Sequence, residues 1–299
     1  MNRNLRESVE FIRHLINNGG PEEKEYDNLT RCFNNFYYAI KRGIIDYDDI
    51  PKYWTSFRKV FLTVNTMQGF VVLKPHGYAG DFEIIDRIYQ KWCSPDKGLT
   101  KWDLYFHERA AVKAVRNRKK YFINTMSKLA KEKNGALSIL NVGSGSGRDM
   151  KELFESLDES NISIDCVDID KKAIQYALKL NKKNATKLNF IHKNILRFNP
   201  QKRYDVIWSA GVFDYLSDKV FLYLLKRFQK WIKKRGYIIL GNFSLKNPTR
   251  PYMEFGHWFL IHRSAEMLVD LATKANLSYR QIAVESEPQG VNLFLKIKF

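Results

Sequence analysis

The chain lacks the features that mark membrane, secreted and zinc-binding proteins. None of its apolar runs reaches the roughly 18 residues that a membrane-spanning helix needs, so no membrane span is expected. The first residues, MNRNLRESVEFIRHLINN, are charged and mixed from the second residue onward, which excludes a secretory signal and predicts a cytoplasmic protein. The cysteines, Cys32, Cys93 and Cys166, lie far apart without paired spacing. That spacing argues against zinc or another metal and against a disulfide framework.

The sequence also lacks repeats, low-complexity tracts and any bias toward disorder. Hydrophobic residues make up 44% and aromatic residues 14%, which is normal for a folded protein. A chain of 299 residues has room for one large domain, or for one domain with a sizeable appendage.

Charge is the strong bias of the composition. The chain has 50 Lys and Arg against 32 Asp and Glu, a net charge of +18 that attracts nucleic acid, anionic lipid or acidic small molecules. The basic residues are scattered over several expected helices, and lysine outnumbers arginine, as in proteins from AT-rich coding sequences. We therefore favour solvated helix faces and a small-molecule substrate. A nucleic-acid partner is the less favoured alternative.

The first 133 residues predict one helix after another. Apolar residues recur at helical spacing, and Gly-Pro pairs or single glycines end the segments. The stretch 69–81, with Pro75 and three glycines, predicts a non-helical connection. The expected helices cover residues 2–18, 21–42, 50–68, 81–92 and 99–133.

From about residue 136 strands and helices alternate. This rhythm predicts an α/β fold, a doubly wound and mostly parallel seven-stranded sheet of Rossmann-like type with helices on both faces. The last two strands read as a hairpin, which predicts an antiparallel edge strand. We therefore expect a helical N-terminal lid or substrate region over 1–133 and a catalytic domain over 134–299. The expected strands are 138–143, 162–169, 188–194, 204–210, 236–243, 277–286 and 291–299.

A glycine-rich turn, residues 143–147 (GSGSG), joins the first strand of this half to its first helix. Glycine permits a tight turn and lets the backbone approach a ligand that a side chain would block. The turn opens the first βαβ unit, where ligands bind at the carboxyl ends of the strands. The second strand ends in CVDID, and an acid at this tip accepts hydrogen bonds from ribose hydroxyls. Asp168 is the ribose candidate, because Asp170 is placed to cap the following helix.

The spacing of the turn narrows the choice of nucleotide. A dinucleotide site usually has Gly-x-Gly-x-x-Gly, and an NTP site has a Walker lysine, but this chain has neither. The glycine turn, the acid at strand two, the polar tip Lys193-Asn194-Ile195 and Ser209-Ala210-Gly211 at strand four together resemble class I S-adenosylmethionine methyltransferases.

This resemblance covers residues 137–243 and implies S-adenosyl-L-methionine as the cofactor. It assigns the glycine turn to the methionine part and ribose, the strand-two acid to ribose and the strand-three tip to adenine. One departure is Asn141, where many members have an acid before the glycines. The implied cofactor-binding residues are Gly143, Ser144, Gly145, Gly147, Asp168, Ile169, Asn194, Ile195, Ser209 and Ala210.

A narrower resemblance runs from about residue 68 to 299. The segments KPHGYAGDFEIIDRIY, AVRNRKKYF, SAGVFDYLSD and GNFSLKNPTRPYMEFGHWFLIHRS are similar to a bacterial subfamily of hydroxypalmitate methyl ester synthases. The resemblance implies small-molecule biosynthesis on a fatty-acid carboxylate. Such an acceptor is ionised at neutral pH and needs no general base, whereas an amine or hydroxyl needs one.

Candidate acceptor residues follow from loops that meet the sheet and from the helical half. Tyr78, in a glycine-flanked loop, is either a contact or a core residue, and Asp81 is expected to cap a helix. One of Arg116 and Arg118 can bind a carboxylate, of the substrate or of the cofactor, by its planar fork; the alternative is a solvated helix face.

The loops after strands four and five supply the other candidates. Asp214 is either a catalytic contact or a helix cap. Glu254 and His257 form either an acid–base pair or an interior contact, and we favour the interior contact. The hypothesis assigns catalysis to Asp214, Tyr252 and Tyr78, and substrate binding to Arg116, Tyr215, Arg250 and His257.

Other reactions remain open at this point. Aminocarboxypropyl transfer or intramolecular cyclisation of the same sulfonium would release methylthioadenosine instead of S-adenosylhomocysteine. RNA or protein methylation would use the positive charge, although strand four ends in Ser-Ala-Gly-Val-Phe rather than the Asn/Asp-Pro-Pro-aromatic platform of base methylation. A cofactor-binding regulator without turnover is the non-enzymatic alternative.

Overall fold

The computed structural model describes residues 3–134, 136–157 and 161–299, and the chain divides into two compact units. The helical unit contains Met1–Lys113 and Pro248–Phe259, and the sheet unit contains Ala114–Asn247 and Leu260–Phe299. By compactness the chain therefore divides near residue 113, within one continuous helix, and not at the expected residue 133. A short segment after the fifth strand also belongs to the helical unit.

Seven strands of the described residues form one sheet in the order β3-β2-β1-β4-β5-β7-β6. Pairing is parallel from β3 to β5, and β7 is antiparallel to both of its neighbours. The expected closing hairpin is formed by β6 and β7, and the edge strand β6 pairs antiparallel with β7, as predicted. The second strand of the hairpin, β7, is the inner one: β7 buries side chains on both faces, whereas β6 is half-exposed. The strands are β1 Ala136–Val142, β2 Asn161–Asp168, β3 Leu188–His192, β4 Tyr204–Ser209, β5 Ile232–Phe243, β6 Ile282–Ser286 and β7 Asn292–Lys298.

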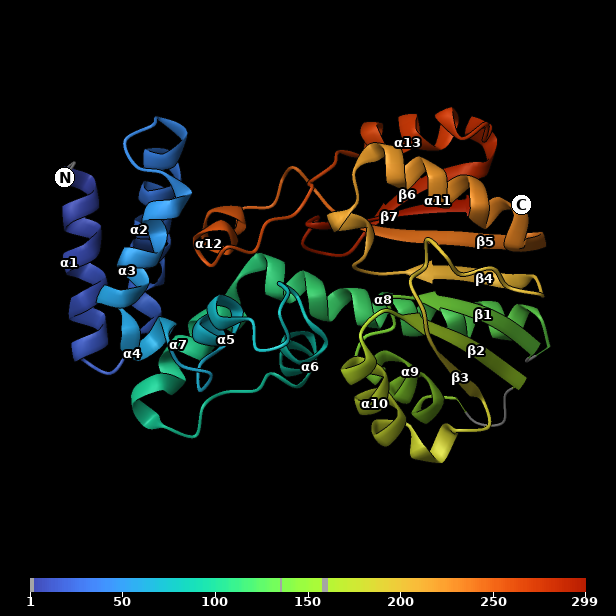
Figure 1. Ribbon diagram of the computed structural model, residues 1–299, viewed down its shortest axis with the longest axis horizontal. Coiled ribbons are helices and arrows are strands. Elements are labelled where there is room, and N and C mark those ends of the chain that lie inside the picture. Colours follow the sequence, from blue (N-terminus) through green and yellow to red (C-terminus); the bar gives the residue numbers. More distant parts are fainter. Residues whose placement is uncertain (1–2, 135, 158–160) are drawn as a thin grey trace. The chain divides into compact units, whose positions relative to one another are not determined.

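Helices cover both faces of this sheet (Figure 1). On one face, α11 and α13 pack apolar side chains such as Phe221, Phe228 and Leu268 against the strands. On the other, α8 and α9 contribute Phe122, Met150 and similar residues to a second core cluster. The bounds of the helices that accompany this unit are α8 Ala110–Glu132, α9 Arg148–Glu155, α10 Lys171–Leu180, α11 Asp218–Trp231 and α13 Ala265–Lys274, with short turns η3 Lys182–Asn184, η4 Phe213–Tyr215 and η5 Tyr279–Gln281.

The helical unit is built from shorter helices than the sequence predicts. Where one helix was expected over 50–68, the chain forms two short helices and then breaks before a third. Thr66 caps this third helix by accepting the Gly69 N–H, and a Cβ on Gly69 would lie 1.9 Å from the Thr63 carbonyl oxygen. The helices are α1 Arg3–Asn17, α2 Tyr26–Lys41, α3 Ile50–Ser56, α4 Arg58–Phe61, α5 Met67–Leu73, α6 Phe82–Gln90, α7 Lys97–Glu108 and α12 Arg250–Phe255, with η1 Glu23–Glu25 and η2 Tyr47–Asp49.

Of two further expectations about the helical unit, one was partly wrong and the other is confirmed. Residues 69–73 are helical, so the expected non-helical connection over 69–81 is shorter than predicted. Asp81 caps α6 by accepting the N–H groups of Glu83 and Ile84, which confirms its predicted role. No helix among residues 3–134, 136–157 and 161–299 has both the length and the apolar character to span a bilayer.

Candidate active site

The glycine turn adopts backbone angles that favour glycine. Gly143, Gly145 and Gly147 have φ of +68°, +55° and +71°, in the left-handed region. A Cβ on Gly143 would lie 2.2 Å from Val212 Cγ2, and one on Gly147 would lie 2.8 Å from Asn181 Nδ2. A Cβ on Gly145 would meet nothing within 4 Å. The turn is therefore packed on two sides and open at its centre.

Asp168 lies at the end of β2 and contacts this open centre. One carboxylate oxygen, Oδ2, accepts the Gly145 N–H at 2.8 Å, and the other, Oδ1, accepts the Asp170 N–H at 2.9 Å. Burial raises the pKa of the Asp168 carboxyl. Asp170 caps α10 by accepting the Lys172 N–H, which confirms the expected cap. Each Asp168 oxygen can still accept a second hydrogen bond, as two ribose hydroxyls would require.

Two polar groups at the turn have no hydrogen-bond partner among the described residues. They are Asn141 Nδ2 and Ser144 Oγ, on side chains that are 2% and 6% exposed. A buried donor without a partner costs free energy, so such a site favours a ligand that supplies acceptors. The polar methionine end of a sulfonium cofactor carries a carboxylate and an ammonium. These residues and the open centre of the turn therefore fit the cofactor that the sequence implies.

A buried charge cluster adjoins the fourth strand. Arg118 of α8 is 7% exposed, and its Nη1 lies 3.5 Å from the Ala210 carbonyl oxygen. Burial raises the pKa of Asp149 to about 6 and that of Asp214 to about 7, and the charge of Arg118 opposes both shifts. The structure thus brings Arg118 to the tip of β4 and leaves Arg116 half-buried on the same helix. Sequence reasoning named both arginines but selected Arg116.

The remaining strand-tip residues are held by local contacts. Ser209 is fully buried and donates its hydroxyl to the Val142 carbonyl, joining β4 to β1. Asn194 Oδ1 accepts the Leu196 N–H, and Ile195 packs against the sheet core. Ile169, which follows Asp168, is 64% exposed.

The loop after β4 contains the predicted Asp214 and Tyr215. Asp214 is 1% exposed, and its Oδ1 accepts the Phe243 N–H at 2.6 Å, which joins this loop to β5. Tyr215 is half-exposed to solvent at 43%. Asp214 is not the cap of α11 that the alternative interpretation expected, because Ser217 occupies that position.

Arg263 was missed by sequence reasoning, although it lies within the quoted HWFLIHRS segment. It is fully buried, and its guanidinium donates to the carbonyl oxygens of Phe213 and Leu216. It also donates to Asn242 Oδ1 at 2.6 Å and pairs with Asp218 at 2.8 Å. One side chain therefore fixes both ends of η4. No periodicity or motif signals this role, which depends on the tertiary fold.

In the helical unit, the predicted residues of α12 are joined to η2. Glu254 forms an ion pair with Arg250 at 2.6 Å and accepts a hydrogen bond from the Tyr47 hydroxyl. His257 Nε2 contacts the Tyr47 carbonyl oxygen at 3.1 Å, and burial lowers the pKa of His257. Glu254 thus contacts Tyr47 and Arg250 rather than His257, in agreement with the favoured interior contact. Tyr252 is buried against the rings of Phe33 and Tyr105.

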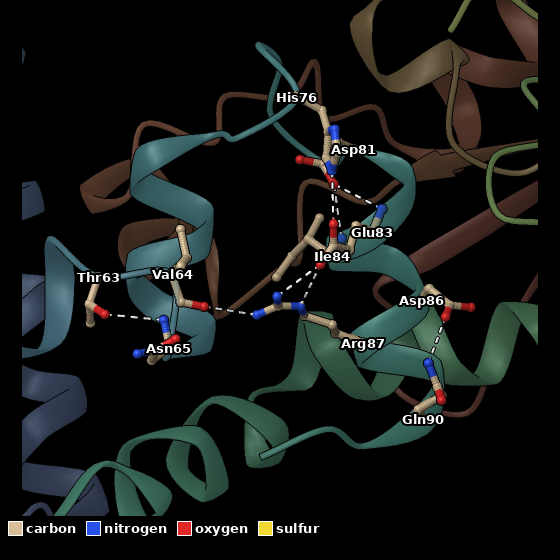
Figure 2. A network of polar contacts seen from close by, with 10 residues as sticks. All are labelled: Thr63, Val64, Asn65, His76, Asp81, Glu83, Ile84, Asp86, Arg87 and Gln90. Atoms are coloured by element: carbon tan, nitrogen blue, oxygen red, sulfur yellow. Dashed lines mark hydrogen bonds and ion pairs between the residues drawn. The ribbon is translucent and has the colours of Figure 1, made fainter. Parts of the chain in front are cut away.

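The loop that carries Tyr78 is anchored by a polar network (Figure 2). His76 Nε2 lies 2.9 Å from Glu83 Oε2, and Glu83 Oε1 pairs with Arg87 at 2.8 Å. Arg87 also donates to the Val64 carbonyl oxygen at 3.0 Å and lies 4.0 Å from the centre of the Phe70 ring. Tyr78, at 39% exposed, is therefore presented from a fixed loop. This segment is part of the narrower resemblance, but the sequence assigns no role to His76, Glu83 and Arg87.

Comparisons with known proteins agree with this geometry. Malonyl-[acyl-carrier protein] O-methyltransferase 2 of Ilyobacter polytropus is 29% identical over 161 residues, which are 50% of this chain and 57% of the relative. Malonyl-[acyl-carrier protein] O-methyltransferase 1 of the same organism is 31% identical over 86 residues, 29% of this chain and 31% of the relative. The chain thus spans little more than half of one relative and about a third of the other.

One solved structure matches nearly the whole chain. A protein of Bordetella parapertussis, described as a possible exported protein, superposes with a TM-score of 0.63 at 15% identity, over 99% of this chain and 95% of its own. At this identity the match shows a common fold.

The family described as methyltransferase domain matches residues 133–282. The match begins just before β1 and ends at the start of β6, so it includes the glycine turn and every predicted cofactor residue. The predicted recognition, fold class and cofactor are thereby confirmed at the level of the family. The chain belongs to this family, and its sheet unit has the class I, Rossmann-like methyltransferase fold, whose cofactor is S-adenosyl-L-methionine.

Proposed function

We propose that this chain methylates a carboxylate of a small acidic or amphiphilic molecule, of the fatty-acyl class. The observation that carries the proposal is the likeness to two proteins named as O-methyltransferases of malonyl-acyl-carrier protein. A malonyl thioester presents a free carboxylate as its oxygen nucleophile. The narrower resemblance to hydroxypalmitate methyl ester synthases implies the same functional group.

The polar groups of the sheet unit support a reaction without a general base. Ser209 donates to Val142, and Asp214 accepts from Phe243, so both groups at the tip of β4 are engaged within the fold. A carboxylate acceptor is already deprotonated at neutral pH. The enzyme then needs mainly to align the reactants and exclude water.

Each cofactor residue has a distinct task in this proposal. When bound, S-adenosylmethionine supplies an electrophilic methyl group. Asp168 accepts the ribose hydroxyls, while Asn141, Ser144 and Arg118 orient the methionine end. Asn194 and Ile195 contact the adenine, and the glycine turn keeps space for the sulfonium.

We also propose which residues bind the acceptor. A planar guanidinium binds a carboxylate through two parallel hydrogen bonds, which suits Arg250 or Arg116. Tyr78, Tyr215 and His257 supply aromatic surface and hydroxyl or imidazole groups for an amphiphilic molecule. Tyr252, predicted as catalytic, is instead packed against the rings of Phe33 and Tyr105. Asp214 acts in this scheme by positioning the loop after β4.

The test is an acceptor panel with product identification. Purified protein is incubated with S-adenosylmethionine alone, with hydroxypalmitate and with the malonyl thioester of N-acetylcysteamine. The expected result is S-adenosylhomocysteine and a methyl ester, formed only when a carboxylate acceptor is present. Methylthioadenosine formed without acceptor would instead indicate cyclisation, and methylation of RNA or protein alone would overturn the proposed acceptor class.

A further inference from the structure

One long segment of the sheet unit is rich in positive charge and free of acidic residues. Residues 171–204 contain ten Lys and Arg and no Asp or Glu, whereas the whole chain has 32 acidic residues to 50 basic ones. A second acid-free stretch, residues 219–247, contains eight Lys and Arg, so the basic residues are locally enriched in two places and not evenly scattered. Such a segment has no acidic neighbours of its own to neutralise it.

The fold gathers this segment on one flank of the sheet. It comprises α10, η3, β3 and the connection to β4, and α10 packs against β2 and β3 (Figure 1). Since β3 is an edge strand, the flank has no further strand beside it. We call the exposed basic residues of this segment the basic flank: Lys171, Lys172, Lys179, Lys182, Lys183, Lys193, Arg197, Lys202 and Arg203.

Little of this charge is neutralised within the described part of the chain. Lys202 pairs with Asp165 at 3.0 Å. For the other members of the basic flank, no ion pair is recorded with any acid of residues 3–134, 136–157 and 161–299. An uncompensated row of lysines produces a field that attracts an acidic partner and speeds its association.

The composition of the flank favours a protein partner over nucleic acid. Lysine predominates over arginine, and none of the Phe and Tyr side chains of residues 171–204 is exposed, which leaves His192 as the exposed aromatic ring of the segment for base stacking. Leu178, at 49% exposed, and Leu196, at 38%, provide apolar contacts among the lysines. Apolar contacts inside a charged rim are typical of a protein interface.

We propose that the basic flank docks an acidic carrier protein that delivers the acyl carboxylate as a thioester. The inference rests on the proposed function, because a carrier-bound acid is one form of that acceptor. The ten residues of α10 extend about 15 Å, long enough for its lysines to meet an acidic helix side by side. The thioester arm then carries the carboxylate beyond the docking surface.

The test compares two triple variants of equal charge change. Lys172→Glu, Lys179→Glu and Lys183→Glu reverse three charges of the basic flank. The control reverses Lys219, Lys226 and Lys230 to Glu on α11, which are exposed and have the same spacing. Both variants are assayed with malonyl-acyl-carrier protein and with the small malonyl thioester of N-acetylcysteamine.

The expected result is a split between the two substrates. The flank variant raises KM for the carrier-bound substrate about tenfold or more at low salt, and the effect shrinks at high salt as charges are screened. Its kcat and its KM for the small thioester stay unchanged, and the control variant behaves like the wild type. Equal losses in both variants, or an unchanged KM in the flank variant, would overturn the docking surface.

Direct binding separates this inference from the proposed function. Fluorescence anisotropy with labelled acyl carrier protein should show weaker binding of the flank variant alone. If the wild type methylates neither thioester nor hydroxypalmitate, the proposed function fails whatever the binding result. If it methylates hydroxypalmitate but neither thioester, the proposed function stands and the docking proposal is wrong. If the flank variant loses affinity for an RNA oligonucleotide but keeps its affinity for the carrier protein, the partner is nucleic acid and the docking proposal is wrong.

Discussion

The two units differ in how far along the chain their key polar contacts reach. In the sheet unit, the hydrogen bond from Gly145 to Asp168 joins residues 23 positions apart, and the one from Asp170 to Asp168 joins residues two apart. In the helical unit, the bond from Tyr47 to Glu254 spans 207 positions and that from Trp54 to Phe255 spans 201. The glycine turn and its contact with Asp168 are thus made of local backbone geometry. The α12 side depends on a segment that returns to the helical unit late in the chain.

The largest expected effect is a loss of cofactor affinity when the contact between Gly145 and Asp168 is removed. Asp168→Ala removes the acceptor of the Gly145 N–H and both predicted ribose contacts. Hydrogen bonds to a charged group contribute about 1.5–3 kcal/mol each, so we expect cofactor affinity to fall by about 100-fold or more. Isothermal titration calorimetry with S-adenosylmethionine measures this loss. Asp168→Asn keeps an acceptor oxygen and should lose less, and unchanged affinity in Asp168→Ala would exclude the ribose assignment.

The glycine turn offers a matched pair that separates stability from binding. Gly143→Ala meets Val212 at 2.2 Å and should lower the free energy of unfolding by about 2–4 kcal/mol, from overpacking and a left-handed backbone. In Gly145→Ala, the left-handed backbone should lower the free energy of unfolding by about 1–2 kcal/mol, and the added methyl group clashes with nothing. Its methyl group enters the open centre of the turn.

We therefore expect Gly145→Ala to fold and yet bind the cofactor about tenfold or more weakly, because the added methyl group would occupy the space at the centre of the turn that we assign to the cofactor. Thermal unfolding and calorimetry on both variants check the pair. Normal cofactor affinity in Gly145→Ala would show that the cofactor does not occupy the centre of the turn.

The sequence separation between contacting residues also explains which features of the structure the sequence predicts. The glycine turn, the Asp170 cap and the alternation of β1 to β5 are local signals, and the structure contains all of them. The role of Arg263 follows from residues such as Phe213, 50 positions away in the sequence, so no motif signals it. The break of the predicted helix over 50–68 depends on Gly69 packing against Thr63, a contact that helical periodicity does not encode.

The buried carboxyl of Asp214 should make the free energy of unfolding depend on pH. Burial raises its pKa to about 7, so between pH 4 and 7 the folded chain keeps a proton that the unfolded chain has lost. The free energy of unfolding therefore falls as pH rises through this range, by at most about 1.4 kcal/mol per pH unit for one proton.

Asp214→Asn should remove this slope while keeping an acceptor for the Phe243 N–H. Asp149 and Asp103, whose pKa values burial raises to about 6, add similar slopes at lower pH, so the two proteins are best compared between pH 6 and 7. Urea unfolding at each pH measures the difference. Parallel curves for wild type and variant would show that Asp214 is ionised in the folded protein.

The smallest expected effect tests the distant contact of the helical unit. Arg250→Ala should raise KM for the carboxylate acceptor several-fold, since an exposed or rim charge pair contributes about 0.2–1 kcal/mol and a guanidinium–carboxylate fork somewhat more. Cofactor affinity should stay the same.

Because Arg250 also pairs with Glu254, the variant alone does not distinguish acceptor binding from the packing of α12. Tyr47→Phe is the matched control: it removes the other hydrogen bond to Glu254 and keeps the Arg250 side chain. If both variants raise KM equally, Arg250 acts through the packing of α12; if only Arg250→Ala does, its guanidinium contacts the acceptor.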